Sequence, residues 1–172
     1  MLHIVYGGSA SGKSSYAESF AMSLQGEGRL LYIATMYPYK WNTTEIDPET
    51  MQRIERHRAM RADKGFDTVE CYRHVEHIVA KRQDVLLLEC MSNLLANEMY
   101  LEPDSNAGSD MAETMSPVSN KIVQALIDLS TRVQELVIVT NDVFSDGGSL
   151  TYDESTREYV KNLAEINCAL AR

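Results

Sequence analysis

The chain has 172 residues, of which 44% are hydrophobic and 24% charged, and these are the proportions of an ordinary globular domain. Its length predicts one domain, residues 1–172, with a substantial core. A formal net charge of −9 argues against a general nucleic-acid-binding protein. No apolar run approaches the ~20 residues of a membrane span.

A cytoplasmic location is expected from two features. The first residues lead directly into an apolar strand and a glycine-rich loop, so we expect no signal peptide. Cys71, Cys90 and Cys168 are odd in number and widely spaced in apolar patterns. This pattern favours buried thiols in a reducing compartment over disulfides or a zinc site.

A phosphate-binding loop is the first motif in the chain. Gly7-Gly8-Ser9-Ala10-Ser11-Gly12-Lys13-Ser14 matches G-x-x-x-x-G-K-S/T, between an apolar run at 2–6 and a helical pattern at 13–24. Glycines let backbone N–H groups approach phosphate oxygens, and the helix dipole adds positive potential. Lys13 would reach the β- and γ-phosphates, and the Ser14 hydroxyl would ligate Mg²⁺. A Gly/Ser-rich surface turn is the less favoured alternative.

Hydrophobic periodicity predicts the remaining elements. Further strands are expected at 29–34, 66–71, 84–90 and 136–140, and further helices at 48–62, 73–82, 91–100, 117–132 and 153–170. Asp47 and Ser116 are suitable caps before a proline at the first helical position. Residues 101–116 are expected to form a mobile loop or a lid, and residues 141–151 are predicted to form a second loop. The alternation predicts an α/β fold like that of P-loop NTPases, with a mostly parallel sheet and helices on both faces.

Polar residues follow the predicted strands, at the edge where open α/β sheets bind ligands. Thr35 follows the second strand, Glu70 lies near the end of the third, and Glu89 lies near the end of the fourth. An acid in the position of Glu89 usually orients Mg²⁺ or a water in P-loop proteins. A carboxylate that merely faces solvent remains the alternative.

A basic helix carries the second candidate site. Arg53, His57 and Arg61 are four residues apart and are expected on one helical face, with Arg56 and Arg58 nearby. Such a face repels itself unless an anion such as polyphosphate binds to it. Cationic neighbours would keep His57 neutral, and a neutral imidazole is a competent nucleophile toward phosphorus. A solvated basic face is the open alternative.

Six motifs in this order identify a family resemblance. They are the loop at 7–14, Tyr32-Ile33-Ala34-Thr35, Arg53-Ile54 with His57-Arg58, Thr68-Val69-Glu70-Cys71, Leu87-Leu88-Glu89-Cys90 and Val139-Thr140-Asn141-Asp142-Val143. Together they resemble the bifunctional adenosylcobinamide kinase/adenosylcobinamide-phosphate guanylyltransferase family of cobalamin biosynthesis. The resemblance runs from residue 1 to about residue 171.

The resemblance implies two reactions on one corrinoid substrate. ATP or GTP phosphorylates the aminopropanol hydroxyl of adenosylcobinamide, and GMP is then transferred from GTP to that phosphate. It also implies a covalent guanylyl intermediate on His57, Mg²⁺, and a homo-oligomer such as a trimer. The residues it implies for nucleotide binding, besides the loop at 7–14, are Ala34, Thr35, Met36, Arg58, Arg61, Glu70 and Glu89.

Three departures from the family pattern keep two other functions open. The stretch 141–154 differs from the family's N-E-V-G and following G-I/L-V-P-E, Phe66 replaces a common Trp, and a final strand after the last helix is expected to be missing. One alternative is a P-loop kinase without guanylyltransferase activity. The other is a non-catalytic GTP-binding module.

Overall fold

The fold is built on a parallel sheet. The structure is a computed structural model that describes residues 1–40, 43–101, 115–142 and 152–172. Within them, five strands pair in the order β1-β5-β4-β2-β3, and every pair is parallel. The strands are β1 Leu2–Gly7, β2 Leu30–Ala34, β3 Phe66–Glu70, β4 Val85–Leu88 and β5 Glu135–Asn141. The helices are α1 Lys13–Leu24, α2 Pro48–Arg61, α3 Met91–Tyr100, α4 Pro117–Arg132 and α5 Glu154–Leu170.

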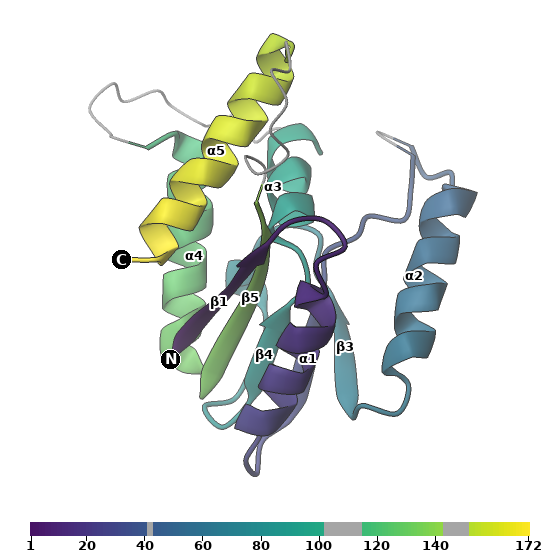
Figure 1. Cartoon of the computed structure of the whole chain (residues 1–172), viewed down its shortest axis with the longest axis vertical. Coiled ribbons are helices and arrows are strands. Elements are labelled where there is room, and N and C mark those ends of the chain that lie inside the picture. The colour runs from purple at the N-terminus through teal and green to yellow at the C-terminus, as the bar shows by residue number, and fades with distance from the viewer. Residues whose placement is uncertain (41–42, 102–114, 143–151) are drawn as a thin grey trace.

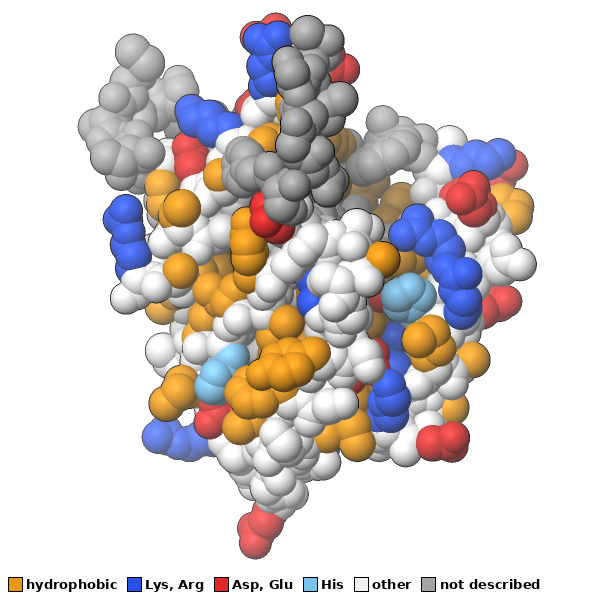
Figure 2. All heavy atoms as spheres, viewed as in Figure 1, with side chains coloured by type: hydrophobic (Ala, Val, Ile, Leu, Met, Phe, Trp, Pro, Cys, Tyr) orange, Lys and Arg blue, Asp and Glu red, His pale blue; other side chains and the backbone are white. Residues whose placement is uncertain are grey.

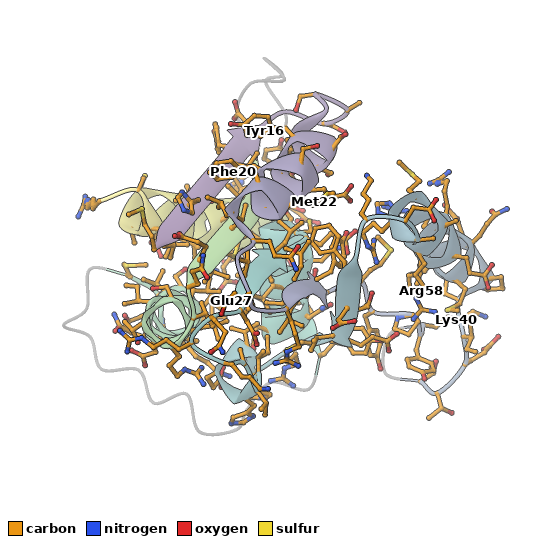
Figure 3. The ribbon with its side chains drawn as sticks, turned by 90° about the horizontal axis from the view of Figure 1, so that it is seen from below. Tyr16, Phe20, Met22, Glu27, Lys40 and Arg58 are labelled. Atoms are coloured by element: carbon orange, nitrogen blue, oxygen red, sulfur yellow. The ribbon has the colours of Figure 1, made fainter. Side chains whose placement is uncertain are left out.

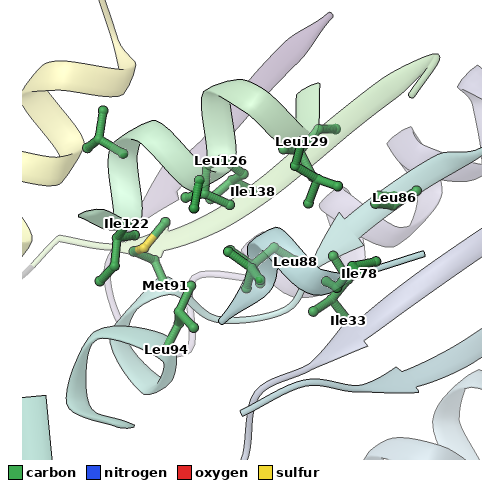
Figure 4. Close-up of a cluster of buried hydrophobic side chains, with 14 of the residues drawn as sticks. Ile33, Ile78, Leu86, Leu88, Met91, Leu94, Ile122, Leu126, Leu129 and Ile138 are labelled. Carbon is green, nitrogen blue, oxygen red and sulfur yellow. The ribbon is translucent and has the colours of Figure 1, made fainter. Parts of the chain in front are cut away.

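Helices cover both faces of the sheet, as predicted (Figure 1). Successive strand side chains point to opposite faces, so neighbours such as Leu86 and Leu87 belong to different cores. Leu86, Leu88 and Ile138 pack with α3, α4 and α5 (Figure 4). Leu87 packs on the other face with Ala17 of α1. Burial on both faces explains why the inner strands β2, β4 and β5 contain long apolar runs, whereas the edge strand β3 is largely polar.

The predicted caps of helices α2 and α4 are confirmed. Asp47 accepts a hydrogen bond from the Thr50 backbone N–H at 3.2 Å, and Ser116 accepts one from the Ser119 N–H at 3.2 Å. Helix α2 lies beside the edge strand β3 in both ribbon views (Figures 1 and 3). Arg61 is the buried residue of this otherwise polar helix. Its guanidinium lies over the ring of Tyr32 in β2.

The predicted helix at 73–82 is wrong. The segment forms only a short 3-10 turn, η1, at Val75–His77. His74 has a left-handed φ of 56°, and its N–H donates to Glu98 Oε1 at 2.7 Å. Ile78 then turns to an extended conformation, so that Val75 and Ile78 are buried in the core while Val79 is 86% exposed. Tertiary contacts and three β-branched residues outweigh the helix-like spacing.

Two other predictions concern the burial of the cysteines and the positions of two loops. The thiols of Cys71 and Cys90 are partly buried, but Cys168 on α5 is exposed, so the prediction that all three are buried is wrong. All three are free cysteines. Most of the two predicted loops, residues 102–114 and 143–151, lies outside the described residues.

Asp84 is a buried carboxylate that holds the start of β4. It accepts hydrogen bonds from the Arg29 N–H at 3.0 Å, the Arg29 guanidinium at 2.6 Å and the Lys81 N–H at 2.8 Å. Burial alone would raise the pKa of Asp84, but these hydrogen bonds and the Arg29 charge outweigh it and lower the pKa. The ionised carboxylate therefore stabilises the fold.

We expect Asp84→Ala to lower the free energy of unfolding by about 3 kcal/mol at pH 7, because buried donors lose their acceptor. Because the folded pKa is the lower one, the loss should be complete above about pH 4 and shrink as pH falls through the folded pKa. Urea unfolding at pH 7 and pH 3 measures both effects. Asp128→Ala, on the exposed side of α4, is the control. An equal loss at both pH values would contradict the role of the charge.

Candidate active site

The predicted phosphate-binding loop joins β1 to α1 at the carboxyl end of the sheet. Gly12 has φ 82° and Ala10 has φ 55°, both left-handed. A Cβ on Gly7 would lie 2.9 Å from Ser11 Oγ, so a larger residue there would require the Ser11 hydroxyl to move. Lys13 Nζ donates to the Gly8 carbonyl at 3.0 Å, which folds its chain back over the loop. Residues 9–12 and 14 are exposed, and the loop is therefore accessible to a phosphate chain.

The carboxyl ends of β2, β3 and β4 carry the second group of predicted residues. Because all strands are parallel, these ends lie at the same edge as the loop after β1. One cavity there is lined by Ala34, Met36, Ile54, His57, Arg58, Arg61, Glu70, Tyr72 and Glu89. The structure thus brings together seven of the predicted site residues, from the ends of β2, β3 and β4 and from α2.

His57 and Glu89 form the central contact of this cavity. His57 Nδ1 lies 3.0 Å from Glu89 Oε1, and the two side chains are 35% and 10% exposed. A carboxylate can only accept hydrogen bonds, so the imidazole proton belongs on Nδ1. In the neutral ring the lone pair then lies on Nε2. The pairing orients His57 and defines which of its nitrogens can attack.

The expected surroundings of His57 need a correction. The spacing of four residues predicts His57 between Arg53 and Arg61 on one face, but its direct partner is the carboxylate of Glu89. Arg53 lines a different cavity, with Asp47. An α-helix has 3.6 residues per turn, so positions 53, 57 and 61 drift around the axis rather than forming a straight row. Lys and Arg side chains still gather along α2 beside a histidine (Figure 2).

Arg61 is buried with unused donors. Only 6% of the residue is exposed, and its Cζ lies 3.4 Å from the centroid of the Tyr32 ring. Its Nε and Nη1 atoms have no hydrogen-bond partner among the described residues. Burial raises the pKa of Tyr32, and the nearby Glu89 carboxylate raises it further. A buried guanidinium with free N–H groups in a cavity is suited to an anion.

Glu70 and Thr35 already have partners within the protein. Glu70 accepts hydrogen bonds from the Arg58 guanidinium and from Tyr72 Oη, the latter at 3.0 Å. Arg58 lies on α2 beside β3 in Figure 3. Thr35 is fully buried, and its hydroxyl donates to the Cys90 carbonyl at 3.1 Å. A direct contact of Thr35 with nucleotide stays a prediction.

Sequence reasoning missed Tyr32 and Tyr72. Tyr32 is the one side chain with a polar group in β2, whose other residues are leucine, isoleucine and alanine. Tyr72 follows Glu70 by two residues and lines the same cavity. A tyrosine within an otherwise apolar central strand is a usable signal, since a buried hydroxyl normally needs a partner.

The predicted metal ligands lie in different surroundings. Ser14 is exposed on the first turn of α1, whereas Glu89 is largely buried against His57. No group of three His, Cys, Asp or Glu residues suited to a metal ion occurs in the described part of the chain. A divalent ion carried by a nucleotide has phosphate and water ligands of its own, so one protein hydroxyl is enough to complete its coordination. The donor set is thus suited to a substrate-borne ion.

A parallel sheet with a phosphate-binding loop after β1 and an oriented histidine at the same edge defines a P-loop nucleotide-dependent transferase. Residues 3–172 match the family described as cobinamide kinase / cobinamide phosphate guanyltransferase. The chain belongs to this family, and it is an enzyme with this pair of activities. The family resemblance inferred from the motifs is thereby confirmed.

Two relatives agree with this assignment. The chain is 31% identical over 151 residues to the bifunctional adenosylcobalamin biosynthesis protein CobU of Escherichia coli, covering 83% of this chain and 76% of that protein. It is also 31% identical over 150 residues to the protein of the same name from Salmonella typhimurium, with the same two coverages. Among the described helices, none has the length and apolar character needed to span a bilayer.

Proposed function

We propose that the loop at 7–14 binds the nucleoside triphosphate for phosphorylation and that His57 carries the guanylyl group in the second reaction. The observation that carries this proposal is the His57 Nδ1–Glu89 contact of 3.0 Å beside the unpaired N–H groups of Arg61. It supplies an oriented nucleophile and a waiting anion site in one cavity. A protein that only phosphorylates or only binds nucleotide has no use for the oriented nucleophile.

In the kinase reaction, backbone N–H groups of the loop and Lys13 hold the β- and γ-phosphates. The substrate hydroxyl attacks the γ-phosphorus, its bond to the β–γ bridging oxygen breaks, and the hydroxyl proton passes to solvent or phosphate. Lys13 neutralises the charge that develops on the leaving oxygens after exchanging its bond to the Gly8 carbonyl for phosphate. Mg²⁺ enters with the nucleotide, and the Ser14 hydroxyl is the proposed protein ligand.

In the guanylyl reaction, His57 Nε2 attacks the α-phosphorus of GTP. A P–N bond forms, the bond to the pyrophosphate oxygen breaks, and pyrophosphate leaves. Glu89 accepts the Nδ1–H hydrogen bond throughout and stabilises the positive charge that the ring acquires. An oxygen of cobinamide phosphate then attacks the same phosphorus, and the P–N electrons return to Nε2. Splitting one displacement into two avoids a direct encounter of two polyanions.

The nucleotide is proposed to lie over the mouth of the His57 cavity. The cavity holds about 20 Å³, which is room for a water molecule but not for a nucleotide. His57 is 35% exposed there, so Nε2 can be reached from outside. Arg58, which is exposed, is proposed to bind the α-phosphate first, and the buried Arg61 is proposed to join it after a shift of its side chain, with Ala34, Met36 and Glu70 as the wall beside it.

Intact-protein mass spectrometry tests the proposal. The protein is incubated with GTP and Mg²⁺ and quenched in alkali, because a phosphoramidate is labile in acid. We expect a GMP-sized adduct that is discharged by cobinamide phosphate. GTP binding without any adduct would contradict the covalent mechanism. It would favour a kinase without guanylyltransferase activity or a binding module.

We expect Glu89→Gln to slow formation of the GMP adduct about 100-fold. Glutamine preserves the size and can still accept from Nδ1–H, but it lacks the charge that stabilises the imidazolium. Single-turnover kinetics with GTP measure the rate, and circular dichroism checks the fold. Glu27→Gln, in the exposed turn after α1, is the control. An unchanged rate in Glu89→Gln would show that the carboxylate does not assist His57.

Three broader properties rest on the family resemblance. Residues 1–172 are proposed to act as one kinase/guanylyltransferase domain in the cytoplasm. The chain is proposed to form a homo-oligomer, with a trimer as the expected state. Light scattering after size-exclusion chromatography measures the mass of the assembly directly.

A further inference from the structure

A second and much larger cavity lies beside the His57 cavity, and none of the steps described above assigns it a role. Its volume is about 1420 Å³, whereas sites for ordinary small ligands hold about 300–1000 Å³. Its wall runs from the carboxyl end of β3 through η1 to the end of α3. The lining includes Tyr37, Val69, Tyr72, Ile78, Val79 and Tyr100. A hollow of this size has room for a ligand larger than a nucleotide.

The two cavities share a wall. Glu70 and Tyr72 line both of them. The Tyr72 hydroxyl donates to Glu70 at 3.0 Å, and Glu70 also accepts from Arg58 on α2. A molecule in the large cavity is therefore separated from the His57 cavity by these two side chains. A flexible arm on such a molecule could pass them and reach His57.

The lining combines aromatic and aliphatic groups with a few donors. Tyr37 and Tyr72 form an edge-to-face pair with centroids 5.4 Å apart. Val79 is 86% exposed within the lining, an uncovered apolar side chain. His74 and His77 stack at 5.6 Å along one side. This mixture suits a broad, mostly uncharged ligand that carries polar groups at its edge.

The histidine side of the cavity is held in place by the protein itself. Glu98, which is 8% exposed, accepts the His74 N–H at 2.7 Å through Oε1. Its Oε2 accepts from Lys121 Nζ at 3.0 Å. These bonds maintain the left-handed backbone at His74. The wall is thus formed before any ligand arrives, which lowers the entropic cost of binding.

We propose that this cavity binds the corrinoid ring of cobinamide, so that its aminopropanol phosphate arm extends past Tyr72 and Glu70 toward His57. This assignment rests on the proposed function. A corrinoid is a broad macrocycle bearing neutral amides, and it is larger than a nucleotide. The arm carries the only group that must meet the guanylyl-bearing nitrogen, and the shared wall is where the two cavities adjoin.

The test is equilibrium binding of cobinamide in the absence of nucleotide, followed by its visible absorbance. Val79→Glu puts a charge into the apolar lining at a position that is 86% exposed and therefore outside the packed core. We expect it to weaken cobinamide binding about tenfold or more, because the bound corrinoid ring would remove water from the new carboxylate at a cost in free energy. GMP-adduct formation with GTP alone should stay at the wild-type rate. Ile127→Glu, an exposed β-branched residue of α4 (40% exposed), is the matched control and should bind cobinamide like the wild type.

Each outcome decides a specific claim. Equal cobinamide affinity in Val79→Glu and Ile127→Glu would overturn the assignment of this cavity, while a normal GMP adduct would leave the proposed function standing. Loss of cobinamide binding in Val79→Glu, in a protein whose wild type forms no adduct, would support the cavity and overturn the covalent mechanism. A lower oligomer mass for Val79→Glu would show a contact between copies instead and overturn the corrinoid assignment.

Discussion

Replacing His57 by alanine is expected to reduce formation of adenosylcobinamide-GDP by about 10⁴-fold or to background, while phosphorylation of cobinamide continues. The substitution removes the nucleophile of the second reaction, which lies on α2. The kinase reaction uses the phosphate-binding loop, which leads into α1 and is unchanged. Product formation from GTP and cobinamide phosphate measures the first activity. Transfer of the γ-phosphoryl group to cobinamide measures the second.

His57→Asn separates nucleophilicity from packing. An asparagine amide can donate to Glu89 in place of Nδ1–H, so the contact that joins α2 to the end of β4 can persist. Both His57 variants should lack the GMP adduct. Arg56→Ala, an exposed neighbour on α2, should form it normally. Continued guanylyl transfer in His57→Asn would exclude the covalent role of the histidine.

Lys13→Ala is expected to lower the rate of cobinamide phosphorylation by about 10³-fold or more. The ammonium is the one side-chain cation of the loop at 7–14, and its loss leaves charge on the β- and γ-phosphates uncompensated. Initial rates at saturating nucleotide measure the effect. Lys161→Ala, 73% exposed on α5, controls for loss of a positive charge.

Near-normal kinase turnover in Lys13→Ala would refute the assignment of the loop. The paired variants also test whether the two reactions use separate machinery. A His57 variant that phosphorylates cobinamide but does not guanylylate its phosphate would show that they do. Loss of both reactions in His57→Asn, with the fold intact, would instead place the histidine in a single shared site.

The fold follows from short-range signals that the chain carries in plain form. Spacing in the loop at 7–14, a cap followed by proline at Asp47 and Ser116, and continuous apolar runs identified ten of the helices and strands. These signals act over a few residues, so they do not depend on the rest of the protein. The helix expected at 73–82 failed because burial of Val75 and Ile78 against other elements decided that segment.

The site depended on both kinds of information. Residue types and motif order indicated a phosphate loop, a nucleophilic histidine and acids near the ends of strands. Only the tertiary structure shows the order of the strands and the contact of His57 with Glu89. It also shows that the Arg61 guanidinium lies over the Tyr32 ring and that Tyr72 belongs to the wall shared by the two cavities. Residues 57 and 89 are joined through a crossover whose path no local pattern specifies. The sequence by itself therefore determined the chemistry and the elements that carry it, while long-range packing decided which groups meet, because such contacts depend on the whole chain.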